Sequence, residues 1–137
     1  MTIHLDTNIA IALLYGRPHQ VRAHFDAARD AGVSIGLSSI VFQELMHGAA
    51  ASGRQRDNEE KIAVFIASGR IALIDFNKAD ATEAADIRAY LKRQGAPIGP
   101  YDVLIAAQAR RAATALVTAN TREFSRVPGL QVLDWNA

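Results

Sequence analysis

Four carboxylates in this chain lie where an α/β fold brings strand ends and helix starts together. They stand in apolar or turn-forming contexts and outside ordinary charged surface runs: Asp6, Glu44, Asp102 and Glu123. Carboxylates that gather in one place repel one another, so one of them takes up a proton unless a cation lies between them. Because an oxygen-only cluster suits hard ions, these acids predict a site for Mg2+ or Mn2+.

Each acid, taken alone, also has an ordinary structural explanation. Asp6 could cap the helix that follows it, and Asp102 could stabilise a helix start through the helix dipole. Glu123 stands between two arginines and could form a surface ion pair. Glu44 has no lysine or arginine three or four positions before or after it, and an unpaired buried carboxylate is costly. Only the set of four, spread over the chain, favours a functional role.

Length and composition predict one globular domain over residues 1–137. The chain has no cysteine, which excludes disulfides and thiolate metal sites and fits a reducing cytoplasm. No apolar run approaches the roughly 20 residues that a membrane span needs. No basic segment followed by an apolar one predicts a signal peptide. We therefore expect a cytoplasmic protein with no membrane partner.

The net charge of +1 conceals an uneven distribution. Setting the four singled-out acids aside leaves 10 acidic residues against 15 basic ones, and twelve of the basic residues are arginines. Arginine has the side chain best shaped for bidentate contact with phosphate. An acidic centre in a mildly basic surround is typical of a metal-dependent nuclease, although scattered arginines can also simply keep a small protein in solution.

Strand and helix patterns alternate along the chain. Strands are predicted at residues 2–5, 33–37, 71–74, 115–118 and 130–133. Helices are predicted at residues 8–15, 19–31, from 38 or 39 to about 48 or beyond, 59–68, 78–94 and 101–113, with a loop at 49–58. This alternation predicts an α/β fold whose parallel sheet of about five strands carries helices on both faces. Such sheets form their sites at the carboxyl ends of the strands, where Asp6 and Glu123 fall.

Several familiar sites are missing from the sequence. It has no glycine-rich loop for a nucleoside triphosphate or a dinucleotide, and no Gly-x-Ser-x-Gly turn for a serine nucleophile. The four histidines have no spacing typical of a metal site. The carboxylates therefore remain the candidate catalytic groups.

Four segments together resemble a known family. They are Leu5-Asp6-Thr7-Asn8, the central Glu44, the stretch 93–102 that ends in Gly99-Pro100-Tyr101-Asp102, and the stretch 117–130 followed by Asp134-Trp135. Over its whole length the chain resembles the PIN-domain ribonuclease toxins of VapC type. It looks closest to the branch that cleaves initiator tRNA in its anticodon stem-loop.

This resemblance implies a PIN-like domain and an endoribonuclease that depends on Mg2+ or Mn2+. It also implies a homodimer. It implies in addition a small VapB-type antitoxin that blocks the site and assembles with the toxin into a hetero-oligomer, in which only the antitoxin contacts the operon DNA. Many PIN domains carry an aspartate where this chain has Asn120, while Glu123 matches a second acidic position of the same motif. Which of the two serves the metal stays open.

The chemistry of phosphodiester hydrolysis suggests roles for these residues. Asp6 and Asp102 could hold the ion, with room for a second ion, and Glu44 could hold a water beside it or act as a base. Neighbouring polar groups that could orient the ligands are Thr7, Asn8, Thr118 and Asn120. Two arginines that could contact RNA phosphates are Arg122 and Arg126.

Two other classes of protein also place acids at strand ends. A haloacid-dehalogenase-like phosphatase needs Asp-x-Asp after its first strand, and this chain has Asp6-Thr7-Asn8. A phosphoryl-accepting receiver needs a late lysine, and none follows Lys92. A purely protein-binding α/β module would bind no Mg2+ and would not respond to neutralisation of the acids.

Overall fold

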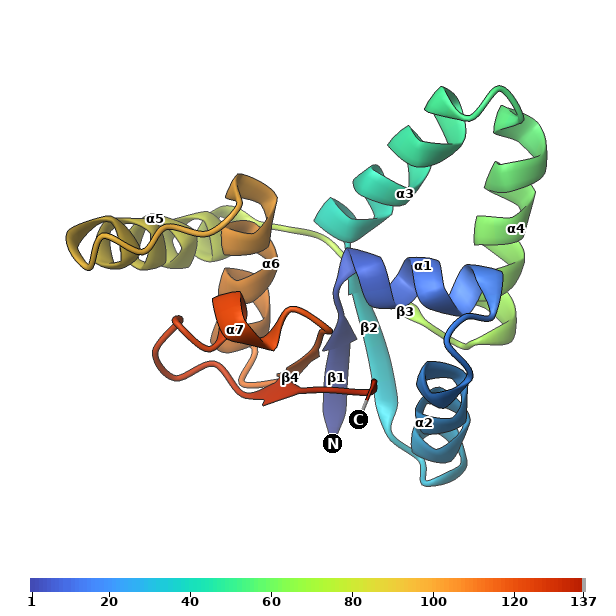
Figure 1. The fold of residues 1–137 in the computed structure, drawn as a ribbon, viewed down its shortest axis with the longest axis horizontal. Coiled ribbons are helices and arrows are strands. Elements are labelled where there is room, and N and C mark those ends of the chain that lie inside the picture. Colours follow the sequence, from blue (N-terminus) through green and yellow to red (C-terminus); the bar gives the residue numbers. More distant parts are fainter. Residues whose placement is uncertain (137) are drawn as a thin grey trace.

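The strands form a single parallel sheet in the computed structural model, which describes residues 1–136 (Figure 1). Within that range the sheet has five strands: β1 (Thr2–Leu5), β2 (Ser34–Ser38), β3 (Ala72–Ile74), β4 (Ala115–Val117) and β5 (Val132–Leu133). Their order is β3-β2-β1-β4-β5, and every neighbouring pair runs parallel. The predicted parallel α/β sheet is confirmed.

Helices cover both faces of this sheet. They are α1 (Thr7–Tyr15), α2 (His19–Asp30), α3 (Ser39–Ala51), α4 (Gln55–Ser68), α5 (Lys78–Arg93), α6 (Pro100–Arg111) and α7 (Thr121–Phe124). In Figure 1, α1, α2 and α4 lie to one side of β1 and β2, and α5 and α6 lie to the other. The chain moves outward from β1 to β3 with helices on one face, then returns to β4 with α5 and α6 on the other, as right-handed crossovers require.

The prediction of a loop at residues 49–58 is wrong over most of that range, because α3 continues to Ala51 and α4 begins at Gln55. Alanine is the strongest helix former, so the alanines that follow Gly48 prolong α3 to Ala51. The connection is limited to the few residues around Ser52, whose hydroxyl donates to the Ala49 carbonyl at 2.7 Å and accepts from the Arg54 N–H at 3.0 Å. Helix α7 was not predicted, because one turn is too short to show a helical pattern.

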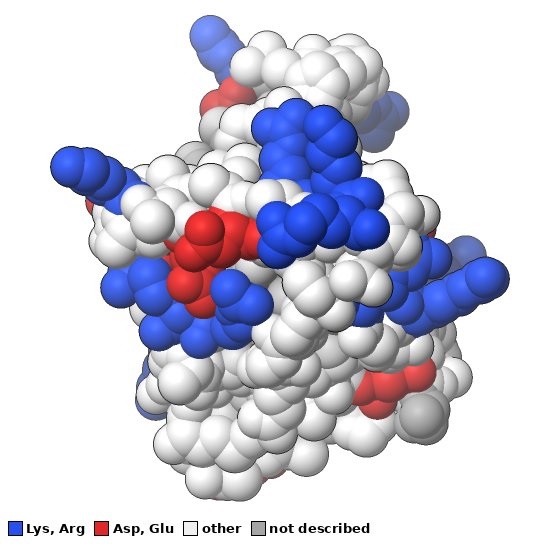
Figure 2. Space-filling view, turned by 90° about the vertical axis from the view of Figure 1, so that its left-hand side faces the viewer, with Lys and Arg blue, Asp and Glu red and all other residues white. Residues whose placement is uncertain are grey.

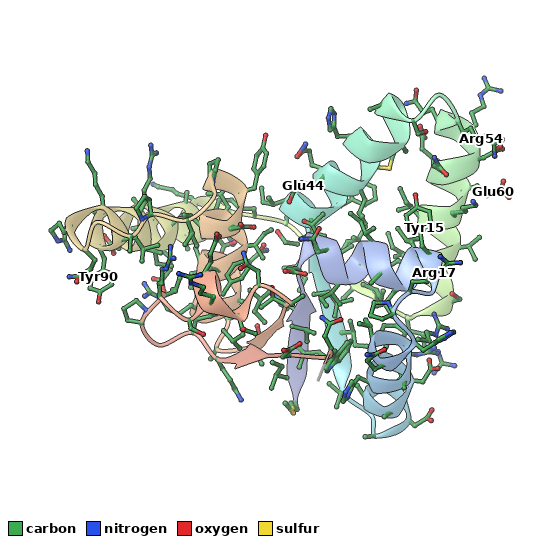
Figure 3. All side chains as sticks on the ribbon, in the orientation of Figure 1. Tyr15, Arg17, Glu44, Arg54, Glu60 and Tyr90 are labelled. Carbon is green, nitrogen blue, oxygen red and sulfur yellow. The ribbon has the colours of Figure 1, made fainter. Side chains whose placement is uncertain are left out.

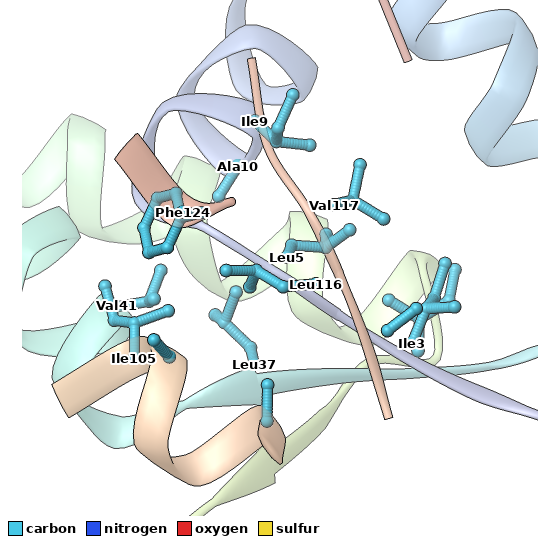
Figure 4. Close-up of a cluster of buried hydrophobic side chains, with 14 of the residues drawn as sticks. Ile3, Leu5, Ile9, Ala10, Leu37, Val41, Ile105, Leu116, Val117 and Phe124 are labelled. Carbon is cyan, nitrogen blue, oxygen red and sulfur yellow. The ribbon is translucent and has the colours of Figure 1, made fainter. Parts of the chain in front are cut away.

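The core lies on both faces of the two central strands. Leu5 and Leu116 have no solvent exposure, and Val117 has none either. Figure 4 shows these side chains packed with Ile105 from α6 and Phe124 from α7. Burial on both faces explains the nearly continuous apolar runs of β1 and β4. It also fixes the end of β1 beside the end of β4, where the polar residues begin.

Among the described residues, no helix has the length and apolar character that a membrane span requires.

Candidate active site at the carboxyl edge of the sheet

Asp6 joins the sheet to the first helix. Its N–H donates to the Val117 carbonyl at 3.0 Å, which continues the pairing of β1 with β4 by one residue. Its Oδ1 accepts a hydrogen bond from the Ile9 N–H at 2.9 Å, so the side chain caps α1. With 4% of its surface exposed, this carboxylate is buried. Strand pairing and capping together leave it one orientation.

Thr118 holds the second oxygen of Asp6. The threonine hydroxyl accepts the Asn120 N–H at 2.9 Å and donates a short hydrogen bond to Asp6 Oδ2. Because a hydroxyl has a single proton and the backbone N–H occupies an acceptor position, that proton is directed at the carboxylate. Asn120 thus contributes to the site through its backbone amide. Thr118 itself has no exposed surface.

Glu44 reaches the same edge of the sheet from α3. Thr7, the residue after Asp6, donates its hydroxyl to Glu44 Oε1 at 2.6 Å. Figure 3 shows Glu44 near the start of α3, close to the start of α1. The glutamate is half-buried, and this hydrogen bond crosses from the first turn of α1 to the second turn of α3. Asn8, also predicted to serve the site, is exposed on α1.

Asp102 enters from the first turn of α6. Gly99 is the residue before that helix, and a Cβ atom added to it would lie only 3.0 Å from Asp102 Oδ2. The backbone thus passes so close to the carboxylate that a side chain at position 99 would displace it. Sequence inspection did not single out this glycine, although Gly99-Pro100 before a helix that opens with an acid is a visible signal.

Glu123 lies in α7 and is half-buried. The ion pairs in the described part of the chain are Arg22–Asp26, Arg110–Glu83 and Arg111–Asp80, and none involves Glu123. The surface pair with a neighbouring arginine, considered above, is therefore not formed.

The two arginines predicted to contact RNA differ in their surroundings. Arg122 is exposed. Arg126 is half-buried, and its Nη1 donates to the Pro97 carbonyl at 3.3 Å. Part of its hydrogen-bonding capacity is therefore used within the protein.

The four acids lie near enough to influence one another electrostatically. Burial raises the pKa of Asp6 to about 6; the hydrogen bonds from Thr118 and Ile9 oppose that shift, while Asp102 and Glu44 add to it. Burial also raises the pKa of Asp102, and the charges of Glu44 and Glu123 raise it further. The site is thus an unneutralised acidic cluster.

A divalent cation fits the chemistry of this cluster. Within residues 1–136, no three acidic or histidine side chains are oriented so that they could hold an ion together as they stand. The acids are instead held by the hydroxyls of Thr7 and Thr118 and by the Ile9 amide. The pKa values of Asp6 and Asp102 are raised mainly by burial and further by the neighbouring acids; a hard cation would offset both effects, and the donors are all oxygen atoms.

Basic side chains surround acidic ones on the side of the molecule that α5 forms. Figure 2 shows a compact group of acidic side chains there, bordered by lysines and arginines. The last turn of α5 contains two basic residues, Lys92 and Arg93. This face offers positive charge to a polyanion.

Comparison with known proteins points in one direction. The chain matches the family described as PIN domain over residues 3–130. It is 41% identical to the tRNA(fMet)-specific endonuclease VapC of Shigella flexneri and 36% identical to the protein of that name from Salmonella typhimurium, with 96% of each chain covered in both alignments. Its fold is similar to the crystal structure of VapBC2 from Rickettsia felis bound to a promoter DNA fragment, with a TM-score of 0.90, 30% identity and coverage of 98% of this chain and 99% of that one.

Proposed function

This chain belongs to the VapC branch of the PIN-domain family of ribonuclease toxins, and we propose that its acidic edge uses Mg2+ or Mn2+ to hydrolyse RNA. The observation that carries the proposal is the environment of Asp6. A carboxylate that is 4% exposed, with a pKa raised to about 6 and two further acids close by, is a costly arrangement for a protein to keep. A bound cation gives it a purpose. The match over residues 3–130 supports a single domain over 1–137.

Each acid has a proposed role in this reaction. Asp6 and Asp102 hold the cation, and Glu123 adds a third carboxylate to it. Glu44, fixed by the Thr7 hydroxyl, orients the attacking water and accepts its proton. When bound, the ion neutralises phosphate charge and stabilises the leaving oxygen. Asn8 and Asn120 are proposed to orient neighbouring groups, Asn120 through the backbone N–H that it donates to Thr118.

Thr118 supports the cluster by fixing one orientation of Asp6. Its hydroxyl proton faces Asp6 Oδ2 because the Asn120 N–H occupies its acceptor side. A carboxylate fixed at both oxygens loses less freedom when it takes up a cation. Thr118 therefore holds Asp6 in a fixed orientation before a cation binds.

The proposed substrate is a tRNA, cut in its anticodon stem-loop. Two relatives that align with 96% of this chain are named for tRNA(fMet), the initiator tRNA. Sequence-specific RNA recognition mostly targets single-stranded loops, whose bases can be splayed away from one another. The exposed Arg122 and the partly available guanidinium of Arg126 are proposed to contact phosphates beside the acids.

The proposed partner is a VapB-type antitoxin, since the similar Rickettsia felis structure is a VapBC complex on DNA. An apolar cavity of about 250 Å³ between α1, α3 and α4 is lined by Ile11, Tyr15 and Leu45, and Glu44 lies at its border. Tyr15 and Ile11 are 64% and 37% exposed and line the same cavity, and contiguous exposed apolar surface marks a site of interaction with a partner. An antitoxin arginine reaching the acids would satisfy their charge. We expect a cytoplasmic homodimer that joins the antitoxin in a hetero-oligomer and meets DNA through it.

Incubation of the purified chain with labelled total RNA tests the proposed activity. Cleavage is expected in Mg2+ or Mn2+ and none in a chelator, and sequencing of the new ends should place the cut in a tRNA anticodon stem-loop. If neither Mg2+ nor Mn2+ supports cleavage and calorimetry detects no metal binding, the chain would instead be a non-catalytic protein-interaction module.

Expression in bacteria tests the toxin assignment separately. The free chain should halt growth, and co-expression of its small antitoxin should restore growth. Harmless accumulation of folded wild-type chain would count against the toxin role, whatever the result with RNA in vitro.

A further inference from the structure

The segment that carries Glu123 has little structure of its own. Helix α7 spans only Thr121–Phe124, and its N-cap residue makes no side-chain capping hydrogen bond. A helix this short is marginal without outside support. The repulsion between Glu123 and Asp102, which contributes to the raised pKa of Asp102, acts to push this segment away. Phe124 and Val127 anchor this segment in the core, and polar contacts beside them are needed to keep Glu123 toward the other acids.

Arg110 of α6 holds the far end of this segment. Its Nη1 donates to the Pro128 carbonyl at 3.0 Å, and its Nε donates to Glu83 Oε2 at 2.7 Å. Gly129 brings the backbone against the same side chain: a Cβ atom there would lie 3.7 Å from Arg110 Cδ. One guanidinium thus joins α5, α6 and the loop after α7, which the compact ammonium of a lysine could not do.

Arg126 holds the near end of the segment. Its Nη1 donates to the carbonyl of Pro97, which lies in the connection between α5 and α6 and precedes the helix of Asp102. Gly99, whose backbone approaches the Asp102 carboxylate, is two residues further along the same connection. A single hydrogen bond therefore ties the segment of Glu123 to the segment that delivers Asp102.

We propose that Arg110 and Arg126 are positioning residues that hold Glu123 beside Asp102, both through the stretch of chain that directly follows α7. They act on the metal through Glu123 and do not touch the substrate's reacting atoms. This inference rests on the proposed function for its metal and deepens the description of that site. Partners that orient a metal-binding carboxylate contribute about 10–100-fold to metal affinity or activity.

A double-mutant cycle on metal binding tests the proposal. Mn2+ and Mg2+ binding to the purified chain is measured by calorimetry, and RNA cleavage is measured across a metal titration. Arg110→Met and Arg126→Met are each expected to weaken metal binding about tenfold. In a chain that already carries Glu123→Gln, the same two substitutions should change it less than about twofold, because the group that they position has lost its charge.

The matched control is Arg22→Met, which removes another arginine ion pair, to Asp26 at 3.3 Å on α2. It should leave metal binding and cleavage unchanged. Equal losses in the presence and absence of Glu123 would overturn the proposal, because the arginines would then act on the fold in general. No loss from either substitution would overturn it as well.

A measurement of folding and the separation of metal binding from cleavage keep the outcome decisive. Circular dichroism reports folding, and if Arg110→Met does not fold, Arg126→Met carries the cycle, since the bond that it removes is on the surface. If the wild-type chain binds metal but cleaves no RNA, the proposed function fails while the calorimetric cycle still decides the role of the arginines.

Discussion

Two buried aspartates in this protein lie in opposite electrostatic surroundings. Asp80 is 1% exposed at the start of α5, and Asp6 is 4% exposed at the start of α1. Both cap a helix, so the local structure around them is the same kind. The difference lies in the charges that each one meets.

Asp80 has a cation of its own. Its Oδ2 accepts the Asn77 N–H at 2.9 Å in a capping box, and the guanidinium of Arg111 pairs with Oδ1. The desolvation cost of burying this carboxylate is thus offset within the protein. It is a structural residue that needs nothing from outside.

Among residues 1–136, Asp6 receives only neutral hydrogen bonds, from Ile9 and Thr118, and the charged groups near it are other acids. The chain contains twelve arginines, and one of them, Arg111, pairs with Asp80. None of the ion pairs in the described part of the chain involves Asp6. The cost of burying a negative charge is offset at Asp80 and is not offset at Asp6. This difference identifies Asp80 as a structural residue and Asp6 as a candidate site residue.

The largest expected effect is the loss of cleavage when an acid of the edge is neutralised. Asp102→Asn and Asp6→Asn should each lower metal-dependent RNA cleavage by well over the roughly 100-fold that an outer partner contributes, because a metal ligand is removed. Initial rates in saturating Mg2+ measure this loss. Asn at position 6 can still cap α1, and Asp102 makes no capping hydrogen bond that Asn would lose, so both variants should fold, as circular dichroism would show.

Asp80→Asn is the matched comparison for that prediction. It neutralises an equally buried aspartate but should keep cleavage at temperatures where the variant is folded. Cleavage by either edge variant at close to the wild-type rate would show that the acids do not hold the ion.

The contrast between the two aspartates could be predicted only in part from the sequence. The apolar runs of β1 and β4 define where each strand ends, so Asp6 and the segment of Glu123 were correctly placed at the carboxyl edge. Asp80 drew no attention, because its partner Arg111 lies 31 residues away and only tertiary structure joins them. The Thr7 bond to Glu44, across 37 residues, was beyond sequence reasoning for the same reason.

Stability distinguishes the two aspartates next. Asp80→Asn should lower the free energy of unfolding by about 1–3 kcal/mol, since it leaves a guanidinium without its partner. The value lies below that of a fully buried pair because the Arg111 side chain is 41% exposed and water can solvate it. Urea denaturation in a chelator measures the change. Asp6→Asn in the same assay should be neutral or stabilising, and an equal loss in both variants would remove the contrast.

The pH dependence of stability should reveal the uncompensated charge. The pKa of Asp6 rises from 3.8 unfolded to about 6 folded, so the folded state binds more protons between these values. The free energy of unfolding of the metal-free chain should therefore fall as pH rises from about 4 to about 7, by about 2 kcal/mol for this group.

Added Mg2+ should recover that loss above pH 6, because the ion then replaces the proton. Denaturation at several pH values, with chelator or with Mg2+, measures both effects. The Asp6→Asn variant is the control and should show a flatter profile. A wild-type profile that does not fall over this range would contradict the picture of an unneutralised Asp6.

Glu123 and Asn120 offer a smaller test within the acidic edge itself. Glu123→Gln should weaken Mg2+ binding or turnover by about tenfold, and Asn120→Ala by less. A carboxylate attracts a divalent ion directly, whereas the contribution of Asn120 in the structure is its backbone N–H, which alanine keeps. Initial rates across a Mg2+ titration decide the order. A larger loss for Asn120→Ala would mean that the amide side chain is the member that serves the metal.

The smallest expected effect concerns Gly99, where backbone and site meet. Its φ of −55° and ψ of 147° suit alanine, so Gly99→Ala should leave stability unchanged or raise it by about 0.4–1 kcal/mol through the unfolded state. The added methyl would lie 3.0 Å from Asp102 Oδ2, so the carboxylate must shift by a few tenths of an ångström. That shift should cost a few-fold in cleavage at limiting Mg2+ and less at saturation. If Gly99→Ala binds the ion more weakly but is no less stable, position 99 is part of the site. If metal affinity and the free energy of unfolding fall together, position 99 supports the fold in general, as Asp80 does.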